Sequence, residues 1–216
     1  MLGRFLSSSG LAEDRCVICG AYADDPYQGY LCGNCMDGIK RDISIRPDRK
    51  LPQVQGFRVF SRYEGVLREI IRLVKFRRVV PLARRIGKAV AEDIGEYAEL
   101  VSPDIITFVP VHIFRRWGRG FDQNEEILRG AGVEFENVLV RVKYSRPLAR
   151  LSKSRRTASV RGAFRVRTRW RERIHGKRVL VFDDVITTGS TAVSVAETLT
   201  GAGASSVYFY FVAYED

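Results

Sequence analysis

The segment VLVFDDVITTGST, from Val179 to Thr191, constrains the fold of this chain more than any other feature. Its four leading apolar residues are typical of a strand buried on both faces, the kind found in parallel sheets. Asp183 and Asp184 follow, then hydroxyl residues around Gly189, then an apolar helical pattern. We therefore predict a strand, a loop and a helix, with the loop beyond the carboxyl end of the strand, where open α/β sheets bind ligands.

The residue types of this loop are suited to hold a sugar phosphate. A turn that enters a helix presents backbone amides and a positive dipole end to an anion, and glycine allows close approach. We expect the phosphate to be cradled by Thr187, Thr188, Gly189, Ser190 and Thr191. The preceding acids suit a pair of sugar hydroxyls or Mg²⁺, so the two adjacent sites together describe a ribose 5-phosphate. The alternative is an ordinary strand, turn and helix capped by Thr or Ser.

The rest of the pattern alternates strands with helices. Strands are predicted at residues 57–63, 104–111, 137–142, 178–184 and 206–214, with a short one at 162–167, and helices at 64–76, 81–98, 122–128 and 190–203. Alternation of this kind predicts a mostly parallel sheet with helices on both faces. A hydrophobic fraction of 45% supports a substantial core.

The positive charge is concentrated in one segment. Between Arg141 and Arg178 there are 15 Lys and Arg residues and one acid, Glu172, whereas the whole chain has a net charge of +11. Such a local positive field favours a polyanionic partner, either nucleic acid or a pyrophosphate-bearing substrate. The alternative is a solvated face whose arginines pair with groups elsewhere.

Four cysteines occupy one short stretch, as two Cys-x2-Cys pairs separated by 12 residues: Cys16, Cys19, Cys32 and Cys35. Two thiolate pairs at this spacing suit a structural, tetrahedral Zn²⁺, and the metal would supply the folding energy of so small a module. A redox pair or buried free thiols are the alternatives. We divide the chain into a lead-in (1–15), a zinc knuckle (16–38), a linker (39–55) and an α/β domain (56–216).

Nothing in the sequence predicts a membrane or export signal. No apolar run approaches the roughly 18 residues of a membrane helix, and the first 16 residues lack the apolar stretch of a signal peptide. We expect a cytoplasmic protein without membrane insertion.

Three motifs beside the VLVFDDVITTGST segment carry a family resemblance: CVIC with CGNC, VPVHIFRRWGRGFDQ, and LSKSRRTASVRGAF. Together they resemble the ComF family, competence-associated proteins with a type I phosphoribosyltransferase-like domain and an N-terminal zinc knuckle. The resemblance extends over residues 16–213. It implies that the chain binds PRPP with Mg²⁺, that Asp183 and Asp184 contact the ribose hydroxyls, and that the process served is DNA uptake.

The resemblance also implies roles for two further segments. Pro110, Val111 and His112 would face the pyrophosphate. In the basic segment, we expect Lys153, Arg155 or Arg156 to close over the leaving group as its negative charge develops. The sequence departs from the family at Leu148 and Ser159, where Gln and Asn are frequent, and these departures leave turnover and specificity open.

Several other residues have two interpretations. Arg115, Arg116 and Arg119 can reach a phosphate, or they belong to a surface turn whose Trp117 and Phe121 pack inward. His112 is either a ligand contact or a structural histidine.

Four residues elsewhere also have two interpretations. Lys75 and Arg77 either favour the end of their helix or contact a phosphate. Phe164 and Trp170, interleaved with arginines, either stack bases of a single strand or face the core.

Two functions follow. The first is an enzyme that transfers phosphoribose to or from a nitrogenous base. The second is a non-catalytic, nucleotide-sensing adaptor in DNA uptake that holds single-stranded DNA and binds competence partners such as a helicase.

Overall fold

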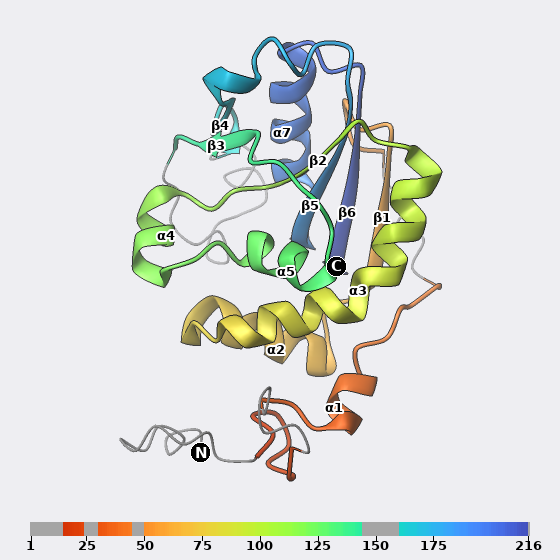
Figure 1. Ribbon diagram of the computed structural model, residues 1–216, viewed down its shortest axis with the longest axis vertical. Helices are drawn as coiled ribbons and strands as arrows, with labels where there is room; N and C mark the ends of the chain where they lie inside the picture. Colours follow the sequence, from red (N-terminus) through yellow and green to blue (C-terminus); the bar gives the residue numbers. More distant parts are fainter. Residues whose placement is uncertain (1–14, 24–29, 45–49, 144–159, 216) are drawn as a thin grey trace.

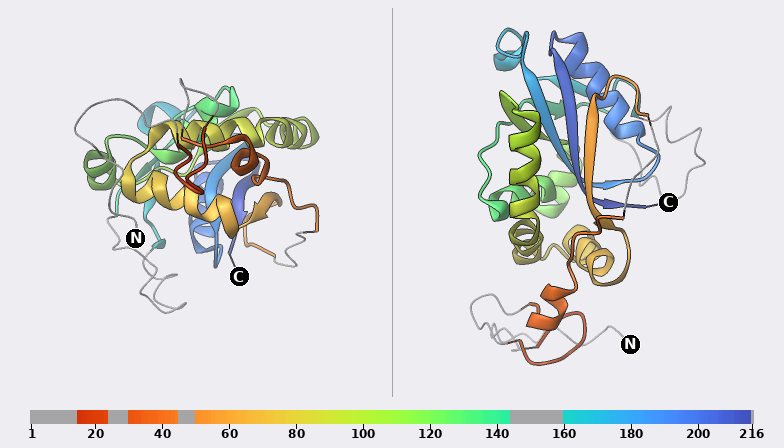
Figure 2. Two further views of the ribbon diagram at one scale, coloured as in Figure 1. Left: turned by 90° about the horizontal axis from the view of Figure 1, so that it is seen from below. Right: turned by 90° about the vertical axis from the view of Figure 1, so that its right-hand side faces the viewer.

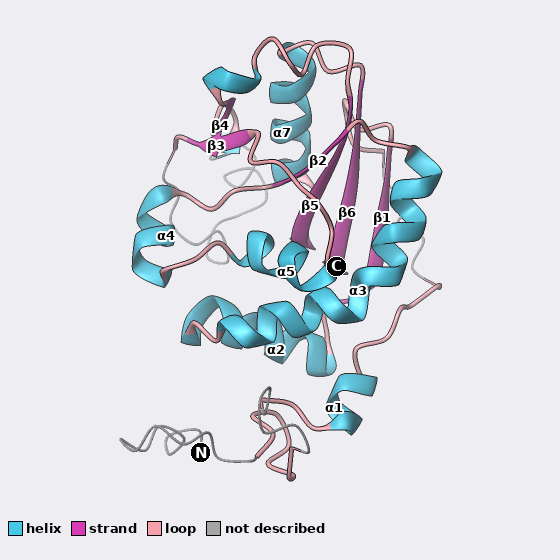
Figure 3. Ribbon diagram, in the orientation of Figure 1, coloured by secondary structure: helices cyan, strands magenta, loops and turns pink. Residues whose placement is uncertain are grey.

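The computed structural model describes residues 15–23, 30–44, 50–143 and 160–215. Its elements, coloured by type in Figure 3, are α1 (Gly33–Asp37), β1 (Gly56–Arg62), α2 (Gly65–Arg77), α3 (Val80–Val101), β2 (Ile105–Phe108), α4 (Ile113–Arg119), α5 (Gln123–Ala131), β3 (Leu139–Arg141), β4 (Phe164–Val166), a 3₁₀ turn (Thr168–Trp170), β5 (Arg178–Ile186), α7 (Ser190–Gly201) and β6 (Ser206–Tyr214).

Four parallel strands form the central sheet, in the order β1-β6-β5-β2. Val181 in the middle of β5 is paired with Thr107 of β2 on one side and with Phe209 of β6 on the other. Because the strands are parallel, their carboxyl ends meet at one edge, the lower edge in Figure 1, and α2 lies across it. The parallel α/β sheet predicted from the sequence is confirmed.

Both faces of the sheet are covered, and β5 shows why its sequence is continuously apolar. Leu180 and Phe182 pack with α2, α3 and α5 in one hydrophobic cluster, whereas Val179 and Val181 pack with α7 in a second. Figure 2 shows α3 and α7 on opposite faces of the sheet. A strand enclosed in this way has no solvent-facing side, so alternation of apolar and polar residues is absent.

A separate two-stranded antiparallel sheet, β3 with β4, lies outside the parallel sheet. The predicted strand at 137–142 therefore forms, but it pairs with the basic segment. Phe164 and Trp170 are both buried, and the guanidinium of Arg173 lies 4.3 Å from the centre of the Trp170 ring. The core-facing interpretation of these two aromatics is thus correct, because neither ring is open to a base.

Two glycines allow α3 and α5 to cross closely. A Cβ atom at Gly87 of α3 would overlap the carbonyl oxygen of Ile127, and one at Gly130 of α5 would overlap the backbone of Arg84. Side chains at these positions would push the helices apart. The crossing fixes the first turn of α5 beside the carboxyl end of β5.

The cysteine-rich module shares a hydrophobic cluster with the α/β domain. Leu31, Cys35 and Ile39 belong to the same cluster of buried residues as Leu67 of α2. Arg41, just beyond the module, lies 2.9 Å from a carboxylate oxygen of the buried Asp93 in α3. The module is therefore packed against the domain, next to α2 (Figure 1).

Within the described ranges, no helix combines the length and the apolar character required to cross a bilayer.

Candidate functional site

Asp183 and Asp184 lie near the carboxyl end of β5, which continues to Ile186, beyond the predicted end of the strand. Both acids are largely buried, with exposed fractions of 8% and 5%. Both carboxyl groups accept a hydrogen bond from the first turn of α5, Asp183 from Asn124 and Asp184 from Gln123, but their other neighbours differ. Those neighbours come from elements distant in sequence, and they make the two acids unequal.

Asp184 is held by a lysine from α2. The Lys75 ammonium lies 3.0 Å from one carboxylate oxygen of Asp184 and 2.9 Å from the other. The Gln123 amide donates a hydrogen bond of 3.1 Å to the same carboxylate, and its own oxygen accepts one of 2.6 Å from Arg119. Asp184 is therefore held by one cation and one amide of the protein.

The donors to Asp183 are both uncharged. The Asn124 amide donates to it at 2.9 Å and the backbone N–H of Asp184 donates at 3.0 Å. The same Asn124 nitrogen also donates to the carbonyl of Val109 at 2.9 Å, which ties Asp183 to the end of β2. Asn124 in turn is fixed by Asp122, whose carboxylate accepts from the Asn124 backbone N–H and caps α5.

The surroundings shift the proton affinities of several of these groups. Burial, and after it the neighbouring charge of Asp184, raises the pKa of Asp183 to about 7. Burial also raises the pKa of Asp122 to about 6, and it lowers the pKa of Arg119. Desolvation disfavours the charged form of each group, so near neutral pH Asp183 is divided between its neutral and ionised forms.

The hydroxyl-rich loop after β5 lies beside the acid pair and enters α7. Gly189 adopts a left-handed conformation (φ +75°) directly before Ser190, the first residue of α7. The hydroxyls of Thr188 and Ser190 are 2.9 Å apart. A Cβ at Gly189 would come within 2.5 Å of a methyl group of Leu51, a residue of the predicted linker that packs on the loop.

A pocket opens between the loop and the strands. It is lined by Asp183, Val185–Ala192 and Phe211. All five predicted phosphate-binding residues line it, together with one of the two predicted acids. Asp184 does not line this pocket, because its carboxylate is turned to Lys75 and Gln123. The pocket joins one carboxyl group to a helix start, where backbone amides and the helix dipole favour an anion.

The loop after β2 is held by one buried acid, Asp122. The backbone N–H of Val111 donates to Asp122 at 2.8 Å, and His112 is a buried residue that caps α4, accepting from the Phe114 backbone N–H at 3.3 Å. His112 thus has a structural role. A pyrophosphate contact by Pro110, Val111 or His112 remains a prediction.

The segment after His112 forms a helix, α4, instead of the surface turn that was one of its two interpretations. Arg116 of this helix pairs with Glu125 at 3.2 Å. Trp117 is 73% exposed, so the idea that it packs inward is wrong, whereas Phe121 packs against the core.

The predicted pyrophosphate clamp, Lys153, Arg155 and Arg156, lies outside the described residues, as do Leu148 and Ser159.

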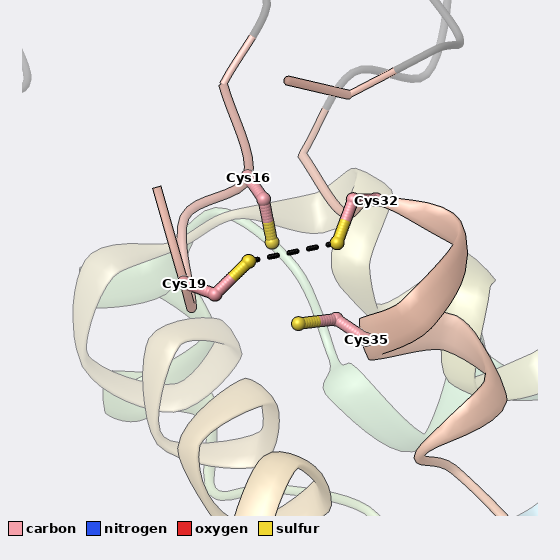
Figure 4. Close-up of side chains that lie close together, drawn as sticks. All are labelled: Cys16, Cys19, Cys32 and Cys35. Carbon is pink, nitrogen blue, oxygen red and sulfur yellow. Dashed lines mark hydrogen bonds between the residues drawn. The ribbon is translucent and has the colours of Figure 1, made fainter. Parts of the chain in front are cut away.

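The four cysteines form a second candidate site. Their sulfur atoms all lie within 4.8 Å of one another, none is in a disulfide, and the sulfurs of Cys19 and Cys32 are 3.6 Å apart (Figure 4). Sulfurs bound to one tetrahedral Zn²⁺ at about 2.3 Å would be about 3.8 Å apart. The cluster therefore fits a tetrahedral ion with four thiolate ligands.

Sequence reasoning did not identify three residues that hold the acid pair. Gln123 and Asn124 stand at the start of the helix predicted at 122–128, and two adjacent amides there were the available signal. The sequence offered another role for Lys75, a favourable interaction with the end of its own helix. Its place beside Asp184, 109 residues away, depends on how α2 packs.

The chain is a distant homologue of two groups of bacterial proteins. It is 26% identical over 200 residues to DNA utilization protein YhgH of Salmonella typhi and to that of Escherichia coli (strain K12), which covers 89% of this chain and 80% of each relative. It is 25% identical over 206 residues to competence protein F of Haemophilus influenzae, covering 92% of this chain and 83% of that protein. The resemblance noted in the sequence is confirmed. No family model matches the chain.

Two solved structures share part of the chain's architecture. One is described as the allosteric regulatory enzyme of purine biosynthesis (TM-score 0.38, 24% identity), the other as glutamine phosphoribosylpyrophosphate amidotransferase from B. subtilis complexed with ADP and GMP (TM-score 0.37, 25% identity). Each match covers 60% of this chain and 25% of the other, so this chain spans about a quarter of either protein.

Proposed function

We propose that this chain, a distant homologue of competence protein F and the YhgH proteins, binds a ribose 5-phosphate group, as in PRPP, at the carboxyl end of β5 and serves DNA uptake. The observation that carries the proposal is one pocket lined by Asp183 together with Thr187–Thr191. The start of α7 and the loop hydroxyls suit the 5-phosphate. A carboxylate at the other end of the loop suits the sugar hydroxyls.

The acid, the metal ions and the basic side chains have separate roles. Asp183 accepts hydrogen bonds from the ribose hydroxyls, and it does so best when ionised. Mg²⁺ bound to PRPP would neutralise the charge of its pyrophosphate. Lys153, Arg155 and Arg156 close over the leaving group, which also excludes water from the activated sugar. The four cysteines hold a structural Zn²⁺.

Binding is tested by calorimetry with ribose 5-phosphate and with Mg²⁺ and PRPP. We expect Asp183→Asn to weaken both by at least about tenfold, or about 1.4 kcal/mol. Asp104→Asn is the matched control, because Asp104 is an acid just before β2, at the opposite end of the sheet, where its carboxylate accepts from the Arg178 N–H. Equal affinity in the wild type and Asp183→Asn, or no heat from any ribose phosphate, would overturn the proposal.

Turnover is tested by pyrophosphate release from PRPP in a screen of nucleobases. Release that is lost in the Asp183→Asn, Asp184→Asn double variant supports a phosphoribosyltransferase.

A second function, an adaptor that holds single-stranded DNA, is favoured by the 15 basic residues between Arg141 and Arg178. Contacts with phosphates release counterions, so binding should fall steeply with salt. Salt-sensitive binding of single-stranded DNA that persists in the double acid variant, without pyrophosphate release from PRPP, supports the adaptor.

A further inference from the structure

The two acids of β5 differ in the charge that faces them. Lys75 lies within 3.0 Å of both carboxylate oxygens of Asp184. Asp183 receives hydrogen bonds only from the uncharged N–H groups of Asn124 and Asp184, among the described residues, and it is the acid that lines the pocket. Asp184 is thus paired with a cation of the protein, whereas Asp183 is the acid found at the pocket.

From this arrangement we propose that Lys75 is a positioning residue of the acid pair: its ammonium fixes and compensates Asp184, and it thereby leaves Asp183 as the carboxylate that meets the ribose. The inference rests on the proposed function, and it adds to that function a residue and a division of roles between the acids.

The fold holds Lys75 in this place from a distance. Its helix, α2, buries Leu67, Ile70, Ile71 and Val74, the stripe expected of an amphipathic helix. Lys75 follows Val74 directly, so it lies at the border of the buried stripe, and only 22% of its side chain is exposed. A long aliphatic stem can be buried there while the ammonium reaches the carboxylate.

The electrostatic reason is that two adjacent buried carboxylates cannot both carry a charge without compensation. The charge of Asp184 raises the pKa of Asp183, and the nearby Lys75 lowers it. Loss of the Lys75 charge would therefore raise the pKa of Asp183 above about 7 and would reduce its ionised fraction at neutral pH. A neutral carboxyl accepts sugar hydroxyls less well than a carboxylate.

Other groups also form hydrogen bonds or charge interactions with the two acids. They are Tyr63 after β1, Arg119 of α4, Gln123 and Asn124 of α5, and Arg141 of β3. Among the described groups, Lys75 is the cation for which an ion pair with Asp184 is found. Removal of the Lys75 charge should therefore change the pKa of Asp183 more than removal of a charge that does not contact the acid pair.

The primary experiment follows the side-chain carboxyl carbons of ligand-free protein by NMR as a function of pH. The proteins are the wild type, Lys75→Met, Lys75→Arg and the control Arg72→Met, with signals assigned through Asp183→Asn and Asp184→Asn. Arg72 lies on the same helix, is exposed and pairs with Glu69, so its loss removes the same charge away from the site. We expect the Asp183 midpoint to rise by about one pH unit or more in Lys75→Met, and to stay unchanged in Lys75→Arg and Arg72→Met.

The second measurement is calorimetry with ribose 5-phosphate between pH 5.5 and 8.5. For the wild type we expect affinity to increase as pH rises through about 7, as Asp183 ionises. For Lys75→Met the increase should move to higher pH, so that the loss of affinity is largest near neutral pH and Lys75→Arg restores it. A uniform loss at every pH would indicate a structural role only and would overturn the inference.

The two hypotheses fail in different ways. An unchanged Asp183 titration in Lys75→Met, with folding verified by thermal melting, overturns the role of Lys75, whatever the ligand data show. If the wild type binds no ribose phosphate, the proposed function and the ligand-facing role of Asp183 are wrong. If the wild type and Lys75→Met bind equally at each pH, the proposed function stands and the inference about Lys75 falls.

Discussion

At the scale of single residues, the local sequence identifies the groups that line the pocket, and packing identifies their partners. Asp183 and the loop to Thr191 are continuous in sequence, so one motif predicts them together. Asn124 and Lys75 reach the acids from α5 and α2. No local pattern distinguishes Lys75 from any other lysine near a helix end, since a cation there already has a favourable explanation.

The raised pKa of Asp183 leads to a prediction about stability. The native state keeps this proton up to about pH 7, whereas an unfolded aspartate loses it near pH 4. The contribution of this group to stability is therefore present below about pH 4 and is lost as pH rises through about 7. Replacing the carboxyl by an amide of the same shape removes that loss.

We expect Asp183→Asn to stabilise the protein by roughly 1–3 kcal/mol at pH 8, and by less at pH 5. Urea unfolding at both pH values measures the difference. Asp184→Asn should have the opposite sign, because it leaves the Lys75 ammonium without its carboxylate. A gain in stability that is the same at pH 5 and pH 8 would contradict the raised pKa of Asp183.

At the scale of elements, periodicity predicts each helix and strand better than it predicts how they meet. The sequence predicts a helix at 64–76, which forms as α2, and the continuous apolar run of β5, which is buried as expected. The small sheet of β3 and β4 was not foreseen as separate from the main sheet, because strand patterns do not name their partners. The α3–α5 crossing was also missed, since a glycine inside a helix pattern does not reveal what it contacts.

That crossing gives a sharp test within one helix. Gly87→Ala inserts a methyl group into the backbone of α5, where Ile127 and Ala131 lie. We expect a loss of about 2 kcal/mol or more, together with displacement of Gln123 and Asn124 and weaker ribose phosphate binding.

Gly95→Ala is the control for this test. Gly95 is in the same helix, and a Cβ there would have nothing within 4 Å. Alanine should therefore stabilise α3 by roughly 0.5–1 kcal/mol. Chemical unfolding of both variants measures the two effects, and similar values for the two would refute the close crossing.

At the scale of the whole molecule, the cysteine module and the α/β domain form one packed body. The sequence predicted the module and its four cysteines, because spacing alone shows that the two pairs can meet. It did not predict the shared hydrophobic cluster or the contact from Arg41 to Asp93. Such contacts depend on how surfaces of separate segments fit, which no spacing rule encodes.

We expect removal of zinc to destabilise the whole chain rather than the module alone. Chelation should expose the face of α2 that the module covers, and each kcal/mol lost should lower the melting temperature by about 2–4 °C. Scanning calorimetry with and without chelator, with zinc released measured in parallel, tests this, and zinc resupply is the control. A domain transition that does not move when all zinc has left would contradict it.

The position of α2 has one more consequence. Near its amino end, Val66 lies against Gly38 of the cysteine module, and near its other end Lys75 meets the acid pair. If a sugar phosphate orders this helix from one end, it also favours the arrangement that the metal requires at the other. By thermodynamic reciprocity, the affinity for the metal and the affinity for the sugar phosphate should then increase or decrease together.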